Sequence, residues 1–202
     1  MINTLIENIN KSLDAEAYLS ALSLALVLPD LCGTVEYNHE SKVGKRYVNW
    51  YNNYIGKYEI QKNDDSNPRL SGEIIYQLRC SMLHEGKPNI DKNKIHEEKN
   101  KIDRFVLVAQ KKNDFDIYSD FSIGPTITTK YIDGKEFTST DNFREYRVNV
   151  RRLCLIICSV AKAYYEDNKD KFDFFNYEII DYDEEVKRLN DYNMKQNKGG
   201  EI

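Results

Sequence analysis

Residues 70–88 read LSGEIIYQLRCSMLHEGKP, and the fold expected for the whole chain is built around this stretch. Its apolar residues follow helical rather than strand spacing. They are Leu70, Ile74, Ile75, Leu78, Met82 and Leu83. Gly86 stands where a left-handed C-terminal cap is favoured, and Pro88 prevents the helix from continuing. The stretch therefore predicts one helix with a marked end, in which Arg79 and His84 are the polar exceptions.

His84 falls in the last turn of this predicted helix. Free carbonyl groups and the macrodipole at a helix C-terminus favour a protonated imidazole. Because histidine ionises near neutral pH, a residue in this position is suited to giving and taking protons. The competing interpretation is structural, with the imidazole serving only as a cap for the last carbonyls.

The pattern of Arg79, four residues and then His84 resembles the Arg-x4-6-His motif of the HEPN superfamily. Residues 21–33 (ALSLALVLPDLCG) and 42–50 (KVGKRYVNW) also resemble an uncharacterised bacterial subgroup that carries the same helix. HEPN proteins often have a polar residue, commonly Asn, directly after the arginine. This chain departs from that pattern, because it has Cys80 there.

The resemblance implies a HEPN-like helical bundle, usually a homodimer, and two alternative functions. Many HEPN proteins are metal-independent endoribonucleases of bacterial defence, abortive-infection or toxin–antitoxin systems. In that case the catalytic residues are Arg79 and His84, and neither a cofactor nor a metal is expected. Other members are non-catalytic modules that bind a nucleotide, RNA or a protein and dimerise. Cys80 and the acidic net charge favour this second function.

Arg79 and His84 are five residues apart, which separates them by about 140° on a straight helix. Two arrangements bring them into one site. The helix end can unwind near His84, or two protomers can place their motif helices side by side about a two-fold axis. The second arrangement agrees with the homodimer that the resemblance implies.

In the resulting site, His84 takes the proton of a ribose 2′-hydroxyl or protonates the leaving 5′-oxygen. Arg79 holds the scissile phosphate. Tyr76 and Ser81 lie close to the motif and are candidates for stacking on a base or binding a phosphate, although packing also explains both. The structural alternative for Arg79 is a buried ion pair, either with Glu73 or with an acidic residue of another helix.

The formal net charge of the 202-residue chain is −4, so nucleic-acid binding requires a local basic patch. Arg144, Arg147 and Arg151 share one face if they stand on one helix, and we expect them either to contact RNA phosphates or to be solvated beside surface carboxylates. The same two alternatives apply to Lys42, Lys45 and Arg46.

The remaining helices are predicted by apolar periodicity. They span residues 3–28, 42–56, about 142–167 and 182–193. The first is expected to end or kink at Pro29-Asp30 and to be followed by a turn at residues 31–33. The third is expected to have Asp141 as its N-cap. The aromatic residues of 42–56 are read as core, and so are Cys154 and Cys158. Residues 61–68 and 87–103 are expected to lie on the surface, and 170–180 to pack back on the body. Residues 1–180 form one helical domain, and 181–202 an acidic helix with a disordered tail.

A small antiparallel sheet is expected as an insertion at about 104–138. Residues 104–110 are β-branched and apolar, and residues 115–121 alternate as a partner strand. Gly124-Pro125 breaks that strand, 126–132 forms a third, and Asp133-Gly134 is a hairpin turn before a short return through Phe137. The fold class is thus mainly α with a β insertion.

The composition also bears on whether the chain is a membrane, secreted, disulfide-bonded or metal-binding protein. Hydrophobic residues make up 41% of the chain, and no apolar run reaches the roughly 18 residues of a membrane span. Residues 15–28 lack the basic start of a signal peptide, so we expect a cytoplasmic protein that does not insert in a membrane. The spacing of the four cysteines suggests no disulfide framework. A metal site of Cys32, His39 and another histidine is conceivable, but we expect none.

Overall fold

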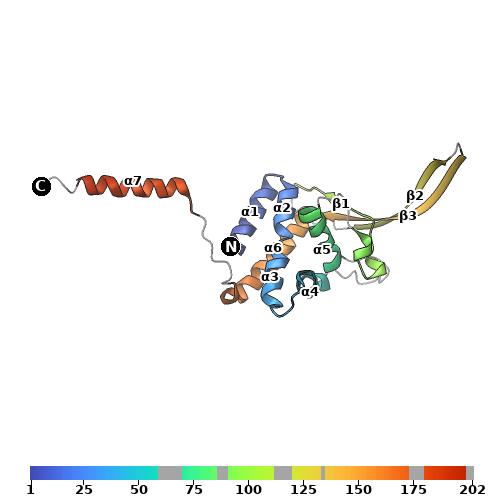
Figure 1. Ribbon diagram of the computed structural model, residues 1–202, viewed down its shortest axis with the longest axis horizontal. Helices are drawn as coiled ribbons and strands as arrows, with labels where there is room; N and C mark the ends of the chain where they lie inside the picture. Colours follow the sequence, from blue (N-terminus) through green and yellow to red (C-terminus); the bar gives the residue numbers. More distant parts are fainter. Residues whose placement is uncertain (59–69, 86–90, 112–119, 133–134, 173–179, 199–202) are drawn as a thin grey trace. The chain divides into compact units, whose positions relative to one another are not determined.

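The computed structural model describes residues 1–58, 70–85, 91–111, 120–132, 135–172 and 180–198. The chain divides into two compact units, Met1–Phe172 and Asp173–Ile202. The first is mainly helical with a small sheet (Figure 1), as the sequence predicts. Its α-helices are α1 Ile2–Asp14, α2 Tyr18–Ala25, α3 Leu28–Glu36, α4 Val43–Tyr54, α5 Gly72–Cys80 and α6 Val150–Asp167. The second contains α7 Tyr182–Lys198.

The core of the first unit forms around α6, whose apolar stripe packs on α1, α2 and α3. Its buried residues include Leu153, Cys154, Ile157, Cys158 and Ala161. From α4, the aromatic rings of Tyr47, Trp50 and Tyr51 are fully buried. The predictions that the aromatic residues of 42–56 and the cysteines of α6 belong to the core are therefore confirmed.

The single N-terminal helix predicted for residues 3–28 is wrong. The chain breaks after Asp14, where Glu16 takes a left-handed conformation with φ 58°. The predicted end at Pro29 is instead the first turn of α3, where proline is favoured because it needs no backbone N–H. The turn expected at residues 31–33 also lies inside α3. There Gly33 allows α4 to approach, since an added Cβ would stand 2.8 Å from the Arg46 carbonyl oxygen.

The sheet is mixed rather than antiparallel as predicted. Its strands are β1 Arg104–Val108, β2 Asp120–Ile132 and β3 Lys135–Asn149, in the order β1-β3-β2. β1 runs parallel to β3, with Arg104 opposite Glu145, whereas β2 pairs antiparallel to β3. β2 does not stop at Gly124-Pro125, because an edge strand tolerates a proline that lacks a ladder donor. Residues 112–119 and the turn 133–134 lie outside the described residues.

β3 extends to Asn149, where the sequence suggested a helix from about residue 142. Pairing with both neighbouring strands holds residues 145–147 extended, and Tyr146 and Val148 are buried. The N-cap of α6 is therefore Asn149, whose side chain accepts a hydrogen bond of 3.1 Å from the Arg152 backbone N–H, and not Asp141.

The charged segment 91–103 contains two short 3-10 turns, Lys92–Lys94 and Glu98–Asn100. Two apolar residues in it, Ile95 and Ile102, are buried. Two further 3-10 turns are Gly56–Tyr58 and Lys169–Lys171. Phe172 packs on Tyr164 and Tyr165, as expected for residues 170–180, while 173–179, 61–68 and Gly86 to Pro88 fall outside the described residues.

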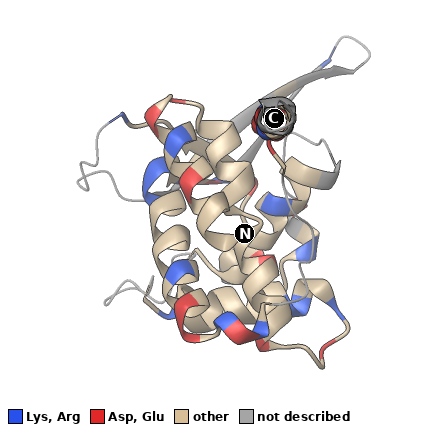
Figure 2. Ribbon diagram, turned by 90° about the vertical axis from the view of Figure 1, so that its left-hand side faces the viewer, with Lys and Arg blue, Asp and Glu red and all other residues tan. Residues whose placement is uncertain are grey.

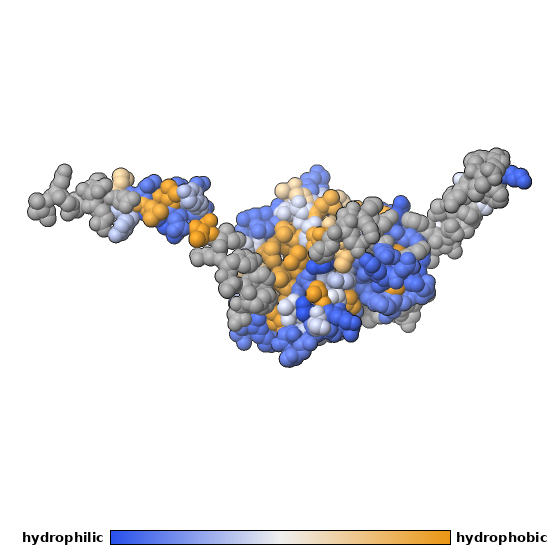
Figure 3. Space-filling model, viewed as in Figure 1, coloured by the Kyte–Doolittle hydropathy of each residue, from blue (hydrophilic) through white to orange (hydrophobic). Residues whose placement is uncertain are grey.

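In the second unit, α7 is longer than the predicted 182–193 and runs to Lys198, so part of the expected disordered tail is helical. Hydrophobic residues show on its surface in Figure 3. Leu189 and Met194 are among its exposed apolar side chains.

One segment, Tyr18–Glu36, is apolar enough over 19 residues to pass a length-and-composition test for membrane spans, with a mean hydropathy of 1.6. This is weak evidence for a membrane, because the core helices of soluble proteins pass the same test. Here Leu22, Ala25 and Leu28 are buried in the helical core.

Candidate functional site

The motif helix α5 begins at a cap that the sequence encodes. The Ser71 hydroxyl accepts a hydrogen bond of 3.4 Å from the Ile74 backbone N–H. The backbone N–H of Gly72 donates to Asn52 Oδ1 on α4 at 2.7 Å. Ile74, Ile75 and Leu78 bury one side of the helix. Glu73, Tyr76 and Gln77 face a pocket, and Arg79 faces α3.

The helix widens after Cys80. Ser81–Glu85 form a π-helical turn, which has more residues per turn than an α-helix and is frequent at functional sites. The rotation per residue is smaller there, so backbone positions 79 and 84 are separated by less than the about 140° of a straight helix. The His84 side chain itself lies outside the described residues.

Arg79 is held by an acidic residue of another helix, one of the two partners that the sequence left open. Its Nη2 lies 2.5 Å from Oδ2 of Asp30 on α3, and only 13% of the Arg79 side chain is exposed. Burial lowers the pKa of Arg79, but the Asp30 charge and the Cys80 thiol outweigh it, so the pKa is raised overall. The guanidinium also lies over the Tyr76 ring, 5.8 Å from its centroid.

Tyr76 connects this ion pair to the pocket. Its ring is 5.2 Å from the ring of Tyr47, and an added Cβ at Gly44 would touch it at 3.0 Å. Burial, followed by the neighbouring Cys80, raises the pKa of the Tyr76 phenol. Ser81, the other residue predicted beside the motif, is buried.

The arginine face predicted on the last long helix does not form. Arg144 and Arg147 lie on β3, and only Arg151 lies on α6. Arg144 Nη1 donates to the Glu98 carbonyl oxygen at 2.9 Å, whereas Arg147 is exposed. Arg151 is buried and donates to the carbonyl oxygens of Leu13 and Gln110, so it holds the fold together and is not displayed to a ligand.

The basic residues at the start of α4 are partly paired. Glu40 accepts from the Lys42 backbone N–H at 2.9 Å, lies 3.6 Å from the Lys45 ammonium, and supplies its carbonyl oxygen to Arg46. The Lys42 hydrogen bond and the Lys45 charge lower the pKa of Glu40 despite some desolvation. In the view of Figure 2, Lys and Arg are interspersed with Asp and Glu along the helices.

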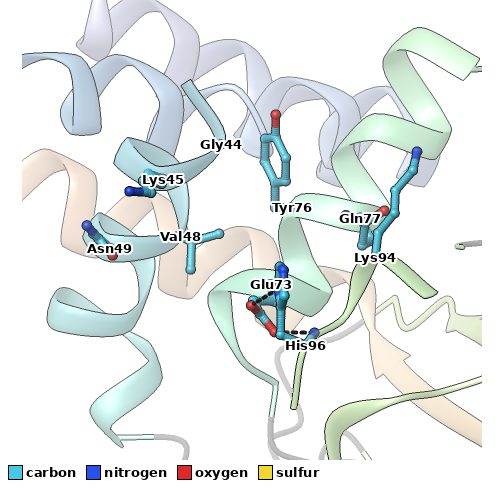
Figure 4. A pocket seen from close by; sticks show the side chains of 9 residues that line it. All are labelled: Gly44, Lys45, Val48, Asn49, Glu73, Tyr76, Gln77, Lys94 and His96. Atoms are coloured by element: carbon cyan, nitrogen blue, oxygen red, sulfur yellow. Dashed lines mark hydrogen bonds and ion pairs between the residues drawn. The ribbon is translucent and has the colours of Figure 1, made fainter. Parts of the chain in front are cut away.

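Sequence reasoning missed a second group of polar residues, between α4, α5 and the segment from Lys94 to His96 (Figure 4). Both carboxylate oxygens of Glu73 are used by His96: Oε1 lies 2.8 Å from the ring Nδ1, and Oε2 accepts from the backbone N–H at 3.2 Å. The pocket beside this pair has a volume of about 410 Å³. No spacing rule joins residue 73 to residue 96, because they are brought together by the tertiary path of the segment 91–96.

Comparisons of this chain with protein-family models, with curated proteins and with solved structures find no match. The assignment of a function therefore rests on the residues and geometry described above.

Proposed function

We propose that this chain is a HEPN-like protein and that its α5 motif cleaves RNA without a metal. The observation that carries the proposal is the π-helical turn Ser81–Glu85, which follows Arg79 and includes His84, and which reduces the angular separation of these two backbone positions. The Asp30 ion pair fixes the guanidinium of Arg79 at that end of the helix.

The reaction that these two residues support is an internal transfer at phosphorus. One His84 imidazole takes the proton of the ribose 2′-hydroxyl, and the 2′-oxygen bonds to phosphorus. The bond to the 5′-oxygen breaks, and that oxygen receives a proton from a second, protonated imidazole. Arg79 stabilises the charge on the phosphate oxygens. The products are a 2′,3′-cyclic phosphate and a 5′-hydroxyl.

A homodimer supplies the second imidazole in this scheme. Two motif helices related by a two-fold axis place two Arg79 and two His84 residues around one cleft. Leu83 supports this proposal, because it lies in the π-helical turn and is an exposed large apolar residue. The cytoplasmic location and a role in bacterial defence or a toxin–antitoxin system belong to the same proposal.

A second candidate is a non-catalytic HEPN-like module that binds a nucleotide, RNA or a protein partner. The observation that favours it is the ion pair itself. A phosphate must share or displace Asp30 to reach a guanidinium whose side chain is only 13% exposed. In this alternative Arg79 stabilises the α3–α5 contact, and the motif helix serves dimerisation.

Cleavage of a single-stranded RNA in the presence of a metal chelator separates the two candidates. The endoribonuclease predicts a cyclic phosphate product, no cleavage of the 2′-deoxy analogue, and loss of activity in Arg79→Ala and in His84→Ala. His39→Ala is the matched control, because His39 is exposed and outside the motif. Cleavage that survives both motif changes rules out this mechanism. A folded dimer that never cleaves but persists in His84→Ala supports the binding module.

A further inference from the structure

The pocket beside α5 is rich in hydrogen-bond donors. It is lined by Gly44, Lys45, Val48, Asn49, Glu73, Tyr76, Gln77, Lys94 and His96 (Figure 4). Its volume of about 410 Å³ lies in the range of small-molecule sites. Two of the nine side chains are lysines and one is a histidine, whereas Glu73 is the only carboxylate among them.

Glu73 is already occupied, because both of its oxygens interact with His96. With Nδ1 beside the carboxylate, the ring nitrogen that remains for a ligand is Nε2. The side chain of His96 is 87% exposed, so this nitrogen is accessible. A protonated imidazole presents Nε2 as a hydrogen-bond donor.

Gln77 offers a polar side chain to the pocket. It is 94% buried, since 6% of its surface is exposed, and its carboxamide has no hydrogen-bond partner among the described residues. The carboxamide is not among the fully buried side-chain groups that lack a partner in the described residues, so it is open to the pocket and can bind water or a ligand there. Gln77 lines the pocket and has an amide donor to offer there.

The walls of the pocket are fixed by close helix contacts. Gly44 on α4 touches the Tyr76 ring, and Gly72 on α5 lies against the backbone of Val48. The backbones of α4 and α5 that carry the donors therefore keep their relative positions before any ligand arrives, which reduces the cost of binding.

We propose that this pocket binds a phosphate group through Lys45, Gln77 and the Nε2 of His96, with Glu73 orienting the imidazole. A phosphate offers several acceptor oxygens and a negative charge, and so matches a pocket of donors whose carboxylate is already used. The phosphate belongs either to a small phosphate ester or to a nucleic-acid strand. The site does not depend on cleavage by the α5 motif.

The test is an NMR titration of the full chain at fixed pH and ionic strength, in which the ring resonances of His96 are monitored. These resonances are assigned by their loss in the His96→Gln variant. The probes are inorganic phosphate, phenyl phosphate and a 2′-O-methyl RNA hexamer, and sodium acetate and sodium chloride are the comparison salts. We expect saturable shifts at His96 with the phosphate probes, weaker binding of acetate, and no matching response at His39.

Lys45→Gln should weaken phosphate binding about tenfold, the loss expected for one charge-assisted hydrogen bond. Lys11→Gln is the matched control, because Lys11 is also an exposed lysine paired with a glutamate but lies on α1. If the RNA hexamer binds more tightly than phenyl phosphate, the phosphate that the pocket recognises belongs to a nucleic-acid strand. If phenyl phosphate binds more tightly, it belongs to a small phosphate ester. The proposal is overturned if the His96 shifts do not saturate, if acetate binds as well as phosphate, or if Lys45→Gln binds as the wild type does.

Discussion

Arg151 is a buried cation that closes the end of a helix. Its Nη2 donates to the Leu13 carbonyl oxygen at 2.6 Å, and its Nε donates to the Gln110 carbonyl oxygen at 2.9 Å. Leu13 lies in the last turn of α1, where carbonyl groups lack partners within the helix. The positive charge also complements the negative end of the α1 dipole. This side chain therefore allows α1 to end inside the protein, beside α6.

Arg151→Ala should lower the free energy of unfolding by about 2 kcal/mol, because buried carbonyls lose a charged donor. The control is Arg147→Ala, which removes an exposed arginine of β3 and should change stability by less than about 0.5 kcal/mol. Urea unfolding followed by the fluorescence of Trp50, the only tryptophan of the chain, measures both changes. Equal effects of the two substitutions would contradict the capping role.

At the scale of elements, the contact between α4 and α5 positions both the motif helix and the pocket. An added Cβ at Gly72 would stand 2.5 Å from the Val48 carbonyl oxygen, a distance that real Cβ atoms do not show. The two helices therefore approach each other by backbone contact at this point. The Asn52 side chain, which accepts from the Gly72 backbone N–H, lies in the same contact.

Gly72→Ala should consequently destabilise the protein by about 1–3 kcal/mol, the usual cost of overpacking, despite the better helix propensity of alanine. Gly124→Ala in β2 is the matched control, since an added Cβ there meets nothing within 4 Å. Gly72→Ala should also move Tyr76, which lies on the same helix, and so weaken phosphate binding in the pocket. A Gly72→Ala protein as stable as Gly124→Ala would show that the helices separate without cost.

Elements were predictable where local signals decide them. The stripes of α4 and α5, and the shared apolar face of Cys154 and Cys158, can be read directly from the sequence. The break between α1 and α2 was not predictable from apolar periodicity, and one of the donors at that helix end, Arg151, comes from far along the chain. The boundary of β3 and α6 depends in the same way on pairing with β1 and β2.

In the candidate site, too, the features set by local sequence were predictable and those set by tertiary structure were not. The motif spacing predicts that Arg79 and His84 belong to one helix end, and the need for an acidic partner of Arg79 was foreseeable. That Asp30 rather than Glu73 fills this role depends on the crossing of α3 and α5. The pairing of Glu73 with His96 also depends on tertiary structure.

At the scale of the whole molecule, the core buries several groups that must stay protonated. Burial raises the pKa of Cys154 and of Cys158 to about 12, with the neighbouring Cys158 contributing at Cys154. Burial raises the pKa of the Cys32 thiol as well, and it also raises that of the Tyr164 phenol, which donates to Glu36. In the unfolded chain the thiols ionise near the ordinary thiol pKa of 9.0.

The sign of the pH dependence follows from these shifts. Above about pH 9 the unfolded state releases thiol protons that the folded state keeps, so each such group lowers stability by up to about 1.4 kcal/mol per pH unit until its folded pKa is reached. The urea midpoint, measured under reducing conditions by Trp50 fluorescence, should fall steadily from about pH 9 upward. Cys154→Ala starts from lower stability because it leaves a cavity, but its midpoint should fall less steeply, since one ionising group is gone. An unchanged slope in this variant, or a midpoint that is flat across this range, would mean that the core opens to ionise its thiols without unfolding.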